Sequence, residues 1–258
     1  MSVALVTGGT KKDVDAMAVL ALNVQEKCPH LADELVIYHD GIRKEDQEKM
    51  NEIMPTTFIR YRCPINWFRL MANRTIRYFS PMVFCKYECL HLLSKYEKVI
   101  WTDYDILIKE NIDELRDLES GLTVIVNHEV PLRDMFYKTI EKADTTTFDL
   151  DGESICMPLF ILTREIGDYE FYYEWCYEMT KKYLRHLYLP EQCILTMMTQ
   201  IFEIPFQEIP KPIYCMHPRE EVEKTKILHA YGQPKFWDGL ENAEWSRYFE
   251  QWKKRKER

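Results

Sequence analysis

Short apolar runs alternate with longer helical segments along the first part of the chain. Apolar runs at residues 3–6, 35–38 and 58–61 have the length of buried strands. Between them, residues 13–28 repeat their apolar positions with the period of a helix, and residues 44–53 form a polar helix. Strands that alternate with helices build parallel sheets with helices on their faces. We therefore predict an α/β fold with a mostly parallel sheet flanked by helices.

The second part of the chain is less regular but contains the same kinds of element. Strands are predicted at residues 122–126 and 155–162, and helices at 169–188 and 190–201. No internal repeat or linker is visible in the sequence. We therefore expect a single domain that spans residues 1–258.

The C-terminal segment, residues 242–258, has the pattern of an aromatic helix with a basic end. A stripe of aromatic residues at helical spacing most often packs on the protein's own core. Aromatic side chains beside a basic cluster also suit a helix that lies on an anionic membrane, so peripheral membrane contact through this tail is the alternative. The stripe consists of Trp245, Tyr248, Phe249 and Trp252, and the basic end of Lys253, Lys254, Arg255, Lys256 and Arg258.

Composition narrows the class of protein. With 258 residues, 46% of them hydrophobic, the chain can bury a full core. Its net charge of −8 argues against a nucleic-acid partner. The eight cysteines include no Cys-x-x-Cys pair, which favours core thiols over a disulfide or zinc framework. No signal-like or membrane-spanning apolar run is present, so we expect a cytoplasmic protein.

Two acidic residues stand at the end of a predicted strand. Asp103 and Asp105 follow the apolar run that starts at Val99, with Tyr104 between them. Open α/β sheets bind ligands at the carboxyl ends of their strands. Hard divalent cations such as Mn²⁺ and Mg²⁺ take oxygen ligands and keep positions open for phosphates. The two carboxylates are therefore candidate ligands for an ion that bridges to a nucleotide diphosphate.

A second cluster lies near the C-terminus, where His229, Gly232 and Lys235 follow one another at intervals of three. Histidine can supply a neutral nitrogen to Mn²⁺, glycine lets the backbone approach a ligand closely, and lysine suits phosphate oxygens. Either motif alone is common by chance, and a plain surface turn is the simpler explanation of each. Their combination favours a site that holds a metal and a diphosphate.

Both motifs resemble those of glycosyltransferase family 8, which includes glycogenin and bacterial lipopolysaccharide galactosyl- and glucosyltransferases. The Asp-x-Asp strand is similar to the corresponding strand of the family. The C-terminal cluster is similar to its His-x-x-Gly-x-x-Lys-Pro-Trp motif, with Phe236 where proline is usual. The similarity keeps its order and spacing along nearly the whole chain.

The resemblance implies a GT-A fold and a metal-dependent enzyme. The expected cofactor is Mn²⁺ or Mg²⁺, with Asp103, Asp105 and His229 as its ligands. The implied reaction transfers a hexose from a nucleotide-sugar, with a UDP-sugar as the expected donor. The implied acceptor is a glycan or a lipid-linked sugar, and the anomeric configuration is retained.

A third segment is similar to the Asp-Gln-Asp-x-Leu stretch that lies near the donor sugar in the family. It makes Gln192 and Glu191 the candidate catalytic residues, although polar and acidic residues are also common at a helix start. Lys86 stands where the family often has an arginine near the diphosphate. Beyond the first strand, the donor contacts that we expect are Lys86, Asp103, Tyr104, Gly232 and Lys235.

The first strand departs from the family pattern. Family members commonly end this strand in Asp-Asp-x-Tyr, whose first acid helps to hold the uracil. Here Val6 is followed by Thr7 and Gly8, with no acid. We expect base recognition at Val6, Thr7 and Gly8, through backbone groups and Thr7, which leaves the identity of the nucleotide open.

Two other classes of protein stay open at this point. Thr7-Gly8-Gly9 after a strand, together with Tyr177 and Lys181, matches features of NAD(P)-dependent short-chain dehydrogenases. However, the turn lacks the third glycine of that motif, and this class leaves the acidic and histidine motifs unexplained. The other alternative is a module that binds a nucleotide-sugar without turning it over.

Overall fold

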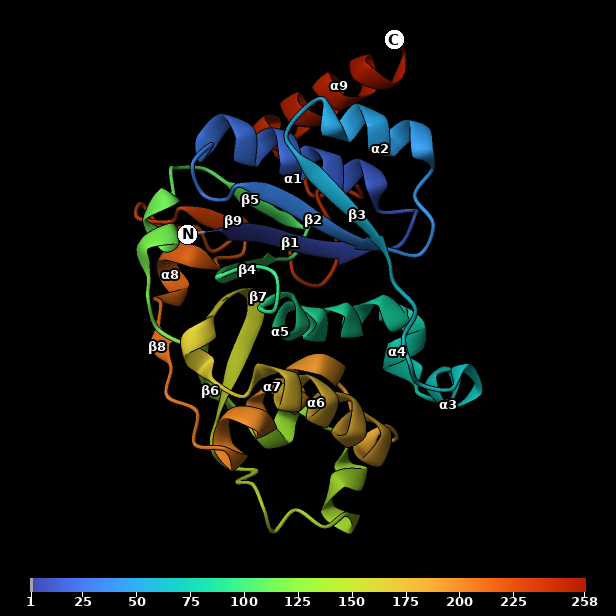
Figure 1. Ribbon diagram of the computed structural model, residues 1–258, viewed down its shortest axis with the longest axis vertical. Helices are drawn as coiled ribbons and strands as arrows, with labels where there is room; N and C mark the ends of the chain where they lie inside the picture. The colour runs from blue at the N-terminus through green and yellow to red at the C-terminus, as the bar shows by residue number, and fades with distance from the viewer. Residues whose placement is uncertain (1) are drawn as a thin grey trace.

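The computed structural model describes residues 2–258 and has a seven-stranded sheet at its centre (Figure 1). Its strands lie in the order β3-β2-β1-β4-β7-β6-β8, and a second sheet pairs β5 with β9. The strands are β1 (Val3–Gly9), β2 (Glu34–His39), β3 (Thr56–Arg60), β4 (Lys98–Thr102), β5 (Ile106–Ile108), β6 (Leu122–Pro131), β7 (Glu153–Thr163), β8 (Gln207–Glu208) and β9 (Ile227–His229).

Helices cover both faces of this sheet. α1 and α9 lie on one face, and α5, α6 and α7 lie on the other (Figure 1). A 3-10 helix, η1 (Pro81–Tyr87), leads into α5. The helices are α1 (Val14–Lys27), α2 (Lys44–Asn51), α3 (Trp67–Ala72), α4 (Arg74–Phe79), α5 (Glu88–Leu92), α6 (Tyr169–Tyr183), α7 (Pro190–Ile201), α8 (Lys211–Tyr214) and α9 (Ala243–Lys256).

β1 contributes to the core on both faces of the sheet. Val3 and Leu5 pack in the cluster that contains α1 and α9, whereas Ala4 and Val6 pack in the cluster that contains α5, α6 and α7. A strand covered on both faces is a continuous apolar run rather than an alternating one. β1 pairs in parallel with β2 and β4, and β2 with β3, so the predicted α/β fold is confirmed.

The sheet changes direction beyond β4. β7 pairs antiparallel with both β4 and β6, and the short β8 returns to a parallel pairing with β6. The predicted strands at 122–126 and 155–162 are parts of the longer β6 and β7. The sheet is thus mostly parallel on the side of the first four strands and antiparallel on the other.

The aromatic stripe of α9 is buried against the protein itself. Trp245, Tyr248 and Trp252 are almost fully covered, and the Trp252 indole nitrogen donates to Asp15 Oδ1 at 2.7 Å. This packing on α1 agrees with the prediction that the stripe covers the protein's own core, and membrane contact through the tail stays an untested alternative. Within residues 2–258, no helix combines the length and the apolar character needed to cross a membrane.

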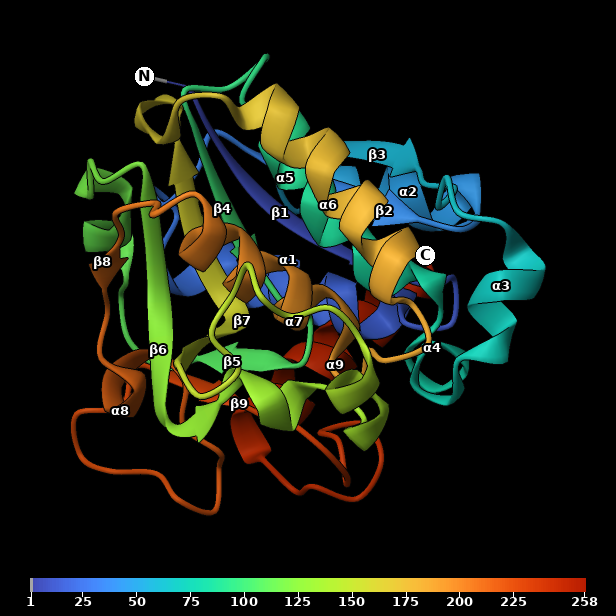
Figure 2. The same ribbon diagram turned by 90° about the horizontal axis from the view of Figure 1, so that it is seen from below.

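The fold places the carboxyl ends of β1 and β4 next to each other. Val6 is the register partner of Trp101, so the glycines after β1 and the acidic turn after β4 share one edge of the sheet. This edge is where open α/β sheets bind their ligands. Figure 2 shows β5 and β9 close to the same region.

Candidate active site

The pairing of β5 with β9 brings the two sequence motifs together. After β4 the chain turns through Asp103 and Asp105, and β5 begins at Ile106. Ile106 is the antiparallel partner of His229, and the Ala230 N–H donates to the Asp105 carbonyl at 2.9 Å. This short ladder fixes the histidine beside the acidic turn.

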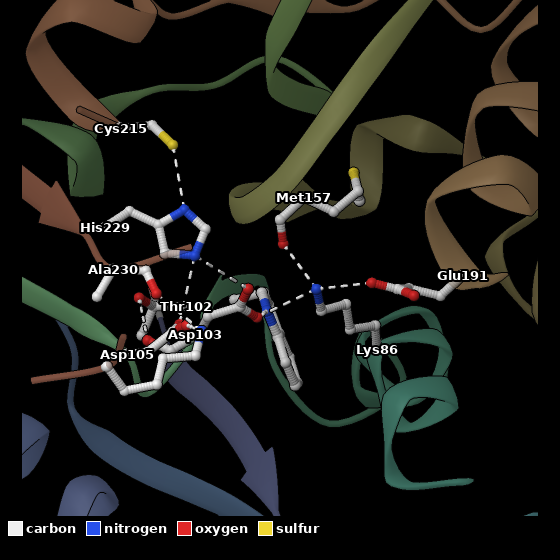
Figure 3. Close-up of polar contacts among 11 residues, drawn as sticks. Lys86, Thr102, Asp103, Asp105, Met157, Glu191, Cys215, His229 and Ala230 are labelled. Atoms are coloured by element: carbon white, nitrogen blue, oxygen red, sulfur yellow. Dashed lines mark hydrogen bonds and ion pairs between the residues drawn. The ribbon is translucent and has the colours of Figure 1, made fainter. Parts of the chain in front are cut away.

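Three candidate metal ligands converge at this turn (Figure 3). His229 Nε2 lies 3.3 Å from Asp105 Oδ1 and 3.8 Å from Asp103 Oδ2. One ligand atom from each of the three side chains lies within 4.8 Å of the others. The structure therefore brings together the three residues that the sequence motifs nominate as candidate ligands.

Cys215 orients the histidine from its other side. Its Sγ lies 3.4 Å from His229 Nδ1, and the thiol is buried just after α8. A partner on one ring nitrogen fixes the direction of the other, as is common for metal-binding histidines. No motif pointed to this cysteine, because only the fold brings it to the site.

Positive side chains balance the buried Asp105 carboxylate. Lys235 Nζ forms an ion pair with its Oδ2, opposite the histidine. Burial raises the pKa of Asp105, but His229 and Lys235 together lower it well below its usual range. Burial lowers the pKa of His229, but Asp105 above all raises it, to about 10. At neutral pH an ionised Asp105 therefore faces two cations.

Lys86 forms a second buried charge centre next to the first. Its Nζ lies 3.1 Å from Asp103 Oδ1, 2.9 Å from Glu191 Oε1 and 3.1 Å from the Met157 carbonyl (Figure 3). The Trp101 indole donates to the same Asp103 oxygen at 2.9 Å. Burial lowers the pKa of Lys86, but Asp103 and Glu191 raise it above its ordinary value, so the lysine stays charged.

The two candidate catalytic residues have different environments at the start of α7. Glu191 is buried, and its carboxylate is paired with Lys86. Gln192 is half-buried, and its amide lies 3.7 Å from the Met135 sulfur. Glu191 is therefore engaged in an ion pair, whereas Gln192 makes only this weak side-chain contact within residues 2–258.

The expected base contacts at the end of β1 are mostly covered. Val6 and Thr7 have no exposed surface, and the Thr7 hydroxyl has no hydrogen-bond partner in the described chain. The Thr7 side chain therefore has no surface to offer a ligand in this structure, and base recognition at this strand end stays a prediction. Gly8 is partly exposed, and a Cβ added there would lie 2.4 Å from Cys85 Sγ, so close packing requires glycine.

A cavity of about 530 Å³ opens at the carboxyl ends of β1, β2 and β3. Segments from α3 to η1 form its other wall. The β1–α1 loop borders it, and Gly9, the last residue of β1 before that loop, lies close to Tyr104 of the acidic turn, since a Cβ on Gly9 would lie 2.9 Å from that ring. The charged residues of the lining are Lys11, Lys12, Asp40, Arg60, Arg62 and Arg77.

The dehydrogenase-like pair does not form a catalytic site. The Tyr177 hydroxyl is bonded to Glu88 Oε1 at 2.7 Å and to the Tyr61 hydroxyl at 2.9 Å, inside the core under α6. Lys181 instead forms an ion pair with Glu178, one turn earlier on the same helix. The Tyr-x-x-x-Lys spacing is therefore structural here.

Comparison with known proteins decides among the remaining classes. A family profile described as glycosyl transferase family 8 matches residues 5–241. The chain belongs to glycosyl transferase family 8. It is a glycosyltransferase, which excludes both the dehydrogenase and the non-catalytic binding module. Comparison of the sequence with curated proteins finds no match.

Solved structures of other glycosyltransferases share the fold of this family 8 chain. The galactosyltransferase LgtC, in complex with donor and acceptor sugar analogs, superimposes with a TM-score of 0.69 at 14% identity, over 98% of this chain and 95% of LgtC. The bifunctional glycosyltransferase WbbM gives 0.69 at 11% identity, over 98% of this chain and 51% of WbbM. Mouse xyloside xylosyltransferase 1 gives 0.57 at 14% identity, over 91% and 100%. The fold is GT-A, as predicted.

Proposed function

We propose that this family 8 enzyme transfers a hexose from a UDP-sugar to a glycan or lipid-linked acceptor, in a metal-dependent reaction that retains the anomeric configuration. The cluster of Asp103, Asp105 and His229 carries the proposal. It stands at the sheet edge where open α/β folds bind nucleotides, and the adjacent cavity has the volume of a typical ligand pocket.

The chemistry of the cluster fits a divalent cation. Two carboxylates and one imidazole nitrogen are donors that Mn²⁺ accepts, and Mg²⁺ is the alternative with its stronger preference for oxygen. When bound, such an ion stabilises negative charge on the departing diphosphate as a Lewis acid. The β5–β9 pairing and Cys215 hold the three ligands in place before any substrate arrives.

Lys235 supplies further positive charge for the diphosphate. Its Nζ is held by Asp105 and by the Ala230 carbonyl at 2.7 Å, beside the ligand cluster. Gly232 has a φ of 72°, a conformation that favours glycine, so the loop turns sharply between the histidine and the lysine. In this proposal the diphosphate also contacts the backbone at Gly232 and the turn at Tyr104.

The nucleoside is assigned to the cavity beside β1, which is lined by Thr10, Lys11 and Lys12 of the loop after that strand. Of Val6, Thr7 and Gly8 at the strand end, only Gly8 has exposed backbone to offer. The observation that LgtC binds donor and acceptor sugar analogs supports a nucleotide-sugar donor and a sugar acceptor here. Uracil fits this assignment, and backbone groups replace the acid that the first strand lacks.

Gln192 is our candidate for the residue beneath the donor sugar. A glutamine-to-glutamate change in LgtC is described as an active-site mutant, which supports a glutamine at such a position. Glu191 contributes differently, because its ion pair holds Lys86 against Asp103. With Glu191 engaged in this way, we favour attack by the acceptor hydroxyl from the face of the departing diphosphate over a carboxylate nucleophile.

A donor-hydrolysis screen tests the proposal. A panel of nucleotide-sugars is incubated with the enzyme in Mn²⁺, in EDTA, and in EDTA followed by excess Mn²⁺. We expect hydrolysis of a UDP-sugar that EDTA abolishes and Mn²⁺ restores, and NMR of the transfer product should show the donor's anomeric configuration. Full activity in EDTA would contradict the metal-dependent mechanism, and an inverted product would contradict retention.

A further inference from the structure

An acid-free segment crosses the rim of the cavity. From Ile53 to Tyr87 the chain contains no aspartate or glutamate, although the whole sequence has 42 acidic residues in 258. The same segment carries five arginines, all of them exposed. They are Arg60, Arg62, Arg69, Arg74 and Arg77.

Large aromatic side chains are exposed on the same segment. Trp67 and Phe68 of α3 are 59% and 83% exposed, and Tyr78 and Phe79 of α4 are 64% and 45% exposed. Exposed aromatic residues that gather in one place indicate an interaction site rather than ordinary surface. Arg60, Arg62 and Arg77 also line the cavity, as does Trp67. We call the four aromatic residues, together with the two arginines outside the cavity lining, Arg69 and Arg74, the aromatic–arginine surface.

Of the two helices that carry this surface, α4 is tied to the core by its buried cap residue, and α3 directly precedes it. The Asn66 side chain caps α3, and the Asn73 side chain caps α4 and donates to the Leu184 and Leu187 carbonyls at 2.8 and 2.9 Å. Figures 1 and 2 both show α3 at the outer edge of the molecule. The exposed rings are therefore held outward by a fixed scaffold.

The arginines have little to neutralise them. Within residues 2–258, Arg60, Arg62, Arg74 and Arg77 make no ion pair or side-chain hydrogen bond, and Arg69 donates only to the Lys181 carbonyl at 3.0 Å. The rest of the protein is acidic enough to give a net charge of −8. A cationic face on an acidic protein directs that one face toward a negatively charged partner.

We propose that the aromatic–arginine surface docks the enzyme on an anionic lipid bilayer. Aromatic rings at the headgroup level and arginines near anionic lipids are the two contributions that hold a protein at this interface. The surface also borders the active-site loop, because the Gln233 amide donates to the Tyr78 hydroxyl at 3.2 Å. Docking would thus bring the opening of the active site close to a lipid-linked acceptor. This benefit of docking rests on the proposed function, which includes such an acceptor.

Vesicle flotation at low salt tests the docking. We expect the full-length protein to bind vesicles of phosphatidylcholine with phosphatidylglycerol, and not vesicles of phosphatidylcholine alone. Phe68→Ser should weaken binding about tenfold through lost apolar contact, and Arg74→Gln about fivefold. Phe206→Ser, which removes an aromatic ring that is 43% exposed elsewhere, should leave binding unchanged.

Two further measurements locate the contact. Trp67 fluorescence should shift to shorter wavelength with anionic vesicles, and Trp67→Phe should lose most of that shift. A Lys253→Gln/Lys254→Gln variant of α9 should bind like the unaltered protein, because the docking face is not on the tail. Phe68→Ser and Arg74→Gln should keep the rate of donor hydrolysis in solution, since neither residue belongs to the proposed donor site.

Several results would overturn the docking proposal. They are no binding to anionic vesicles at low salt, equal binding after Phe68→Ser, and loss of binding only in the α9 variant. Preferential binding to a single-stranded oligonucleotide would assign the surface to another partner. Each of these leaves the donor-hydrolysis screen unaffected, so a failure of docking is distinguishable from a failure of the proposed reaction.

Discussion

Asp105 links the acidic turn to both parts of the C-terminal motif. One of its carboxylate oxygens faces His229 and the other faces Lys235. Replacing it would remove one of the three proposed metal ligands and leave two cations without their shared counter-charge. Replacing Asp105 should therefore have effects on metal binding and on local charge that replacing an exposed surface acid would not have.

Asp105→Asn should abolish Mn²⁺ binding and lower turnover. Loss of charge stabilisation at the leaving group is worth several kcal/mol, so we expect a fall of about 10²- to 10³-fold. Titration calorimetry with Mn²⁺ and the transfer rate measure the two effects. Asp117→Asn is the matched control, because Asp117 is an exposed acid at the opposite end of β4 from the acidic turn. Its neighbour Arg116 accepts a hydrogen bond from Lys98, the first residue of β4, through its carbonyl. Equal loss in both variants would indicate a general effect on folding.

Lys86 should matter for stability as well as activity. Lys86→Ala leaves the buried Glu191 carboxylate and the half-buried Asp103 carboxylate without their shared cation, which should lower the free energy of unfolding by about 3 kcal/mol. Urea unfolding measures this change. Lys86→Arg keeps the charge and should recover most of the loss, and a Lys86→Met/Glu191→Leu variant should recover part of it. Unchanged stability in Lys86→Ala would contradict the buried network.

The sequence contained enough information to find the ligand cluster but not its supports. Asp103 and Asp105 lie two residues apart, and His229 lies in a recognisable motif, so local spacing identified them. Lys86 and Glu191 were each predicted as site residues, but their ion pair was not, because they are distant in sequence, and Cys215 has no motif at all. The contacts of Lys86 with Glu191 and of Cys215 with His229 depend on how helices and loops pack in three dimensions. The spacing of residues along the chain gives no information about that packing.

At the scale of elements, two hypotheses compete for α9: its aromatic stripe packs on the protein's own core, or it lies on a membrane. Its aromatic pattern predicts a buried face in either case, but not whether the cover is protein or lipid. The structure places this face on α1, where Trp252 also finds a hydrogen-bond acceptor in Asp15. The stripe alone could not reveal that acceptor, because Asp15 lies in the first helix.

Trp252→Ala should therefore destabilise the fold strongly. Removing a fully buried tryptophan costs about 3–5 kcal/mol, measured by urea or thermal unfolding. Phe249→Ala, on the half-buried edge of the same stripe, should cost clearly less. If Trp252→Ala left stability unchanged but removed vesicle binding, α9 and not the α3–α4 region would be the membrane element.

Glu34 should make stability depend on acid pH. Burial raises the pKa of this carboxyl, but hydrogen bonds from Tyr96 at 2.6 Å and Thr57 at 2.7 Å lower it more, so its folded pKa is below the ordinary 4.5. A lowered folded pKa gives stability that is present above pH 4.5 and is lost as the pH falls through the folded pKa.

The corresponding test compares Glu34→Gln with the unaltered protein across this range. At pH 7 the variant should be less stable by about 1 kcal/mol, because it loses charge-assisted hydrogen bonds between β2, β3 and the segment before β4. The difference should shrink toward zero in acid. Glu45→Gln, an exposed acid on α2, should show no such pH-dependent difference. A difference that stays constant with pH would exclude the ionised carboxylate as its cause.

Strands that are buried on both faces could be predicted from sequence, whereas the short strands that build the site could not. β1 and β2 have continuous apolar runs, but β5 and β9 are three residues each and depend on pairing with each other and, for β9, with Met216. The antiparallel direction of β7 was also hidden, since strand direction depends on the path of the chain between strands and not on strand composition.

At the scale of the whole molecule, the two core clusters join distant parts of the chain. The cluster on one face of the sheet runs from Val3 to Trp252, and the cluster on the other face runs from Ala4 to Ile204. β4 and β7 are adjacent in the same sheet, so the parallel and antiparallel halves share hydrogen bonds as well as apolar contacts. Neither half has a hydrophobic core of its own.

This arrangement predicts that residues 1–258 unfold as a single domain. Scanning calorimetry should show one transition with equal calorimetric and van't Hoff enthalpies, the usual test for two-state unfolding. Trp252→Ala in one cluster and Leu187→Ala in the other should both move this single transition to lower temperature, because each removes a buried side chain from a shared core. Two resolved transitions, each sensitive to only one of the substitutions, would instead divide the chain into two domains at the border between β4 and β7.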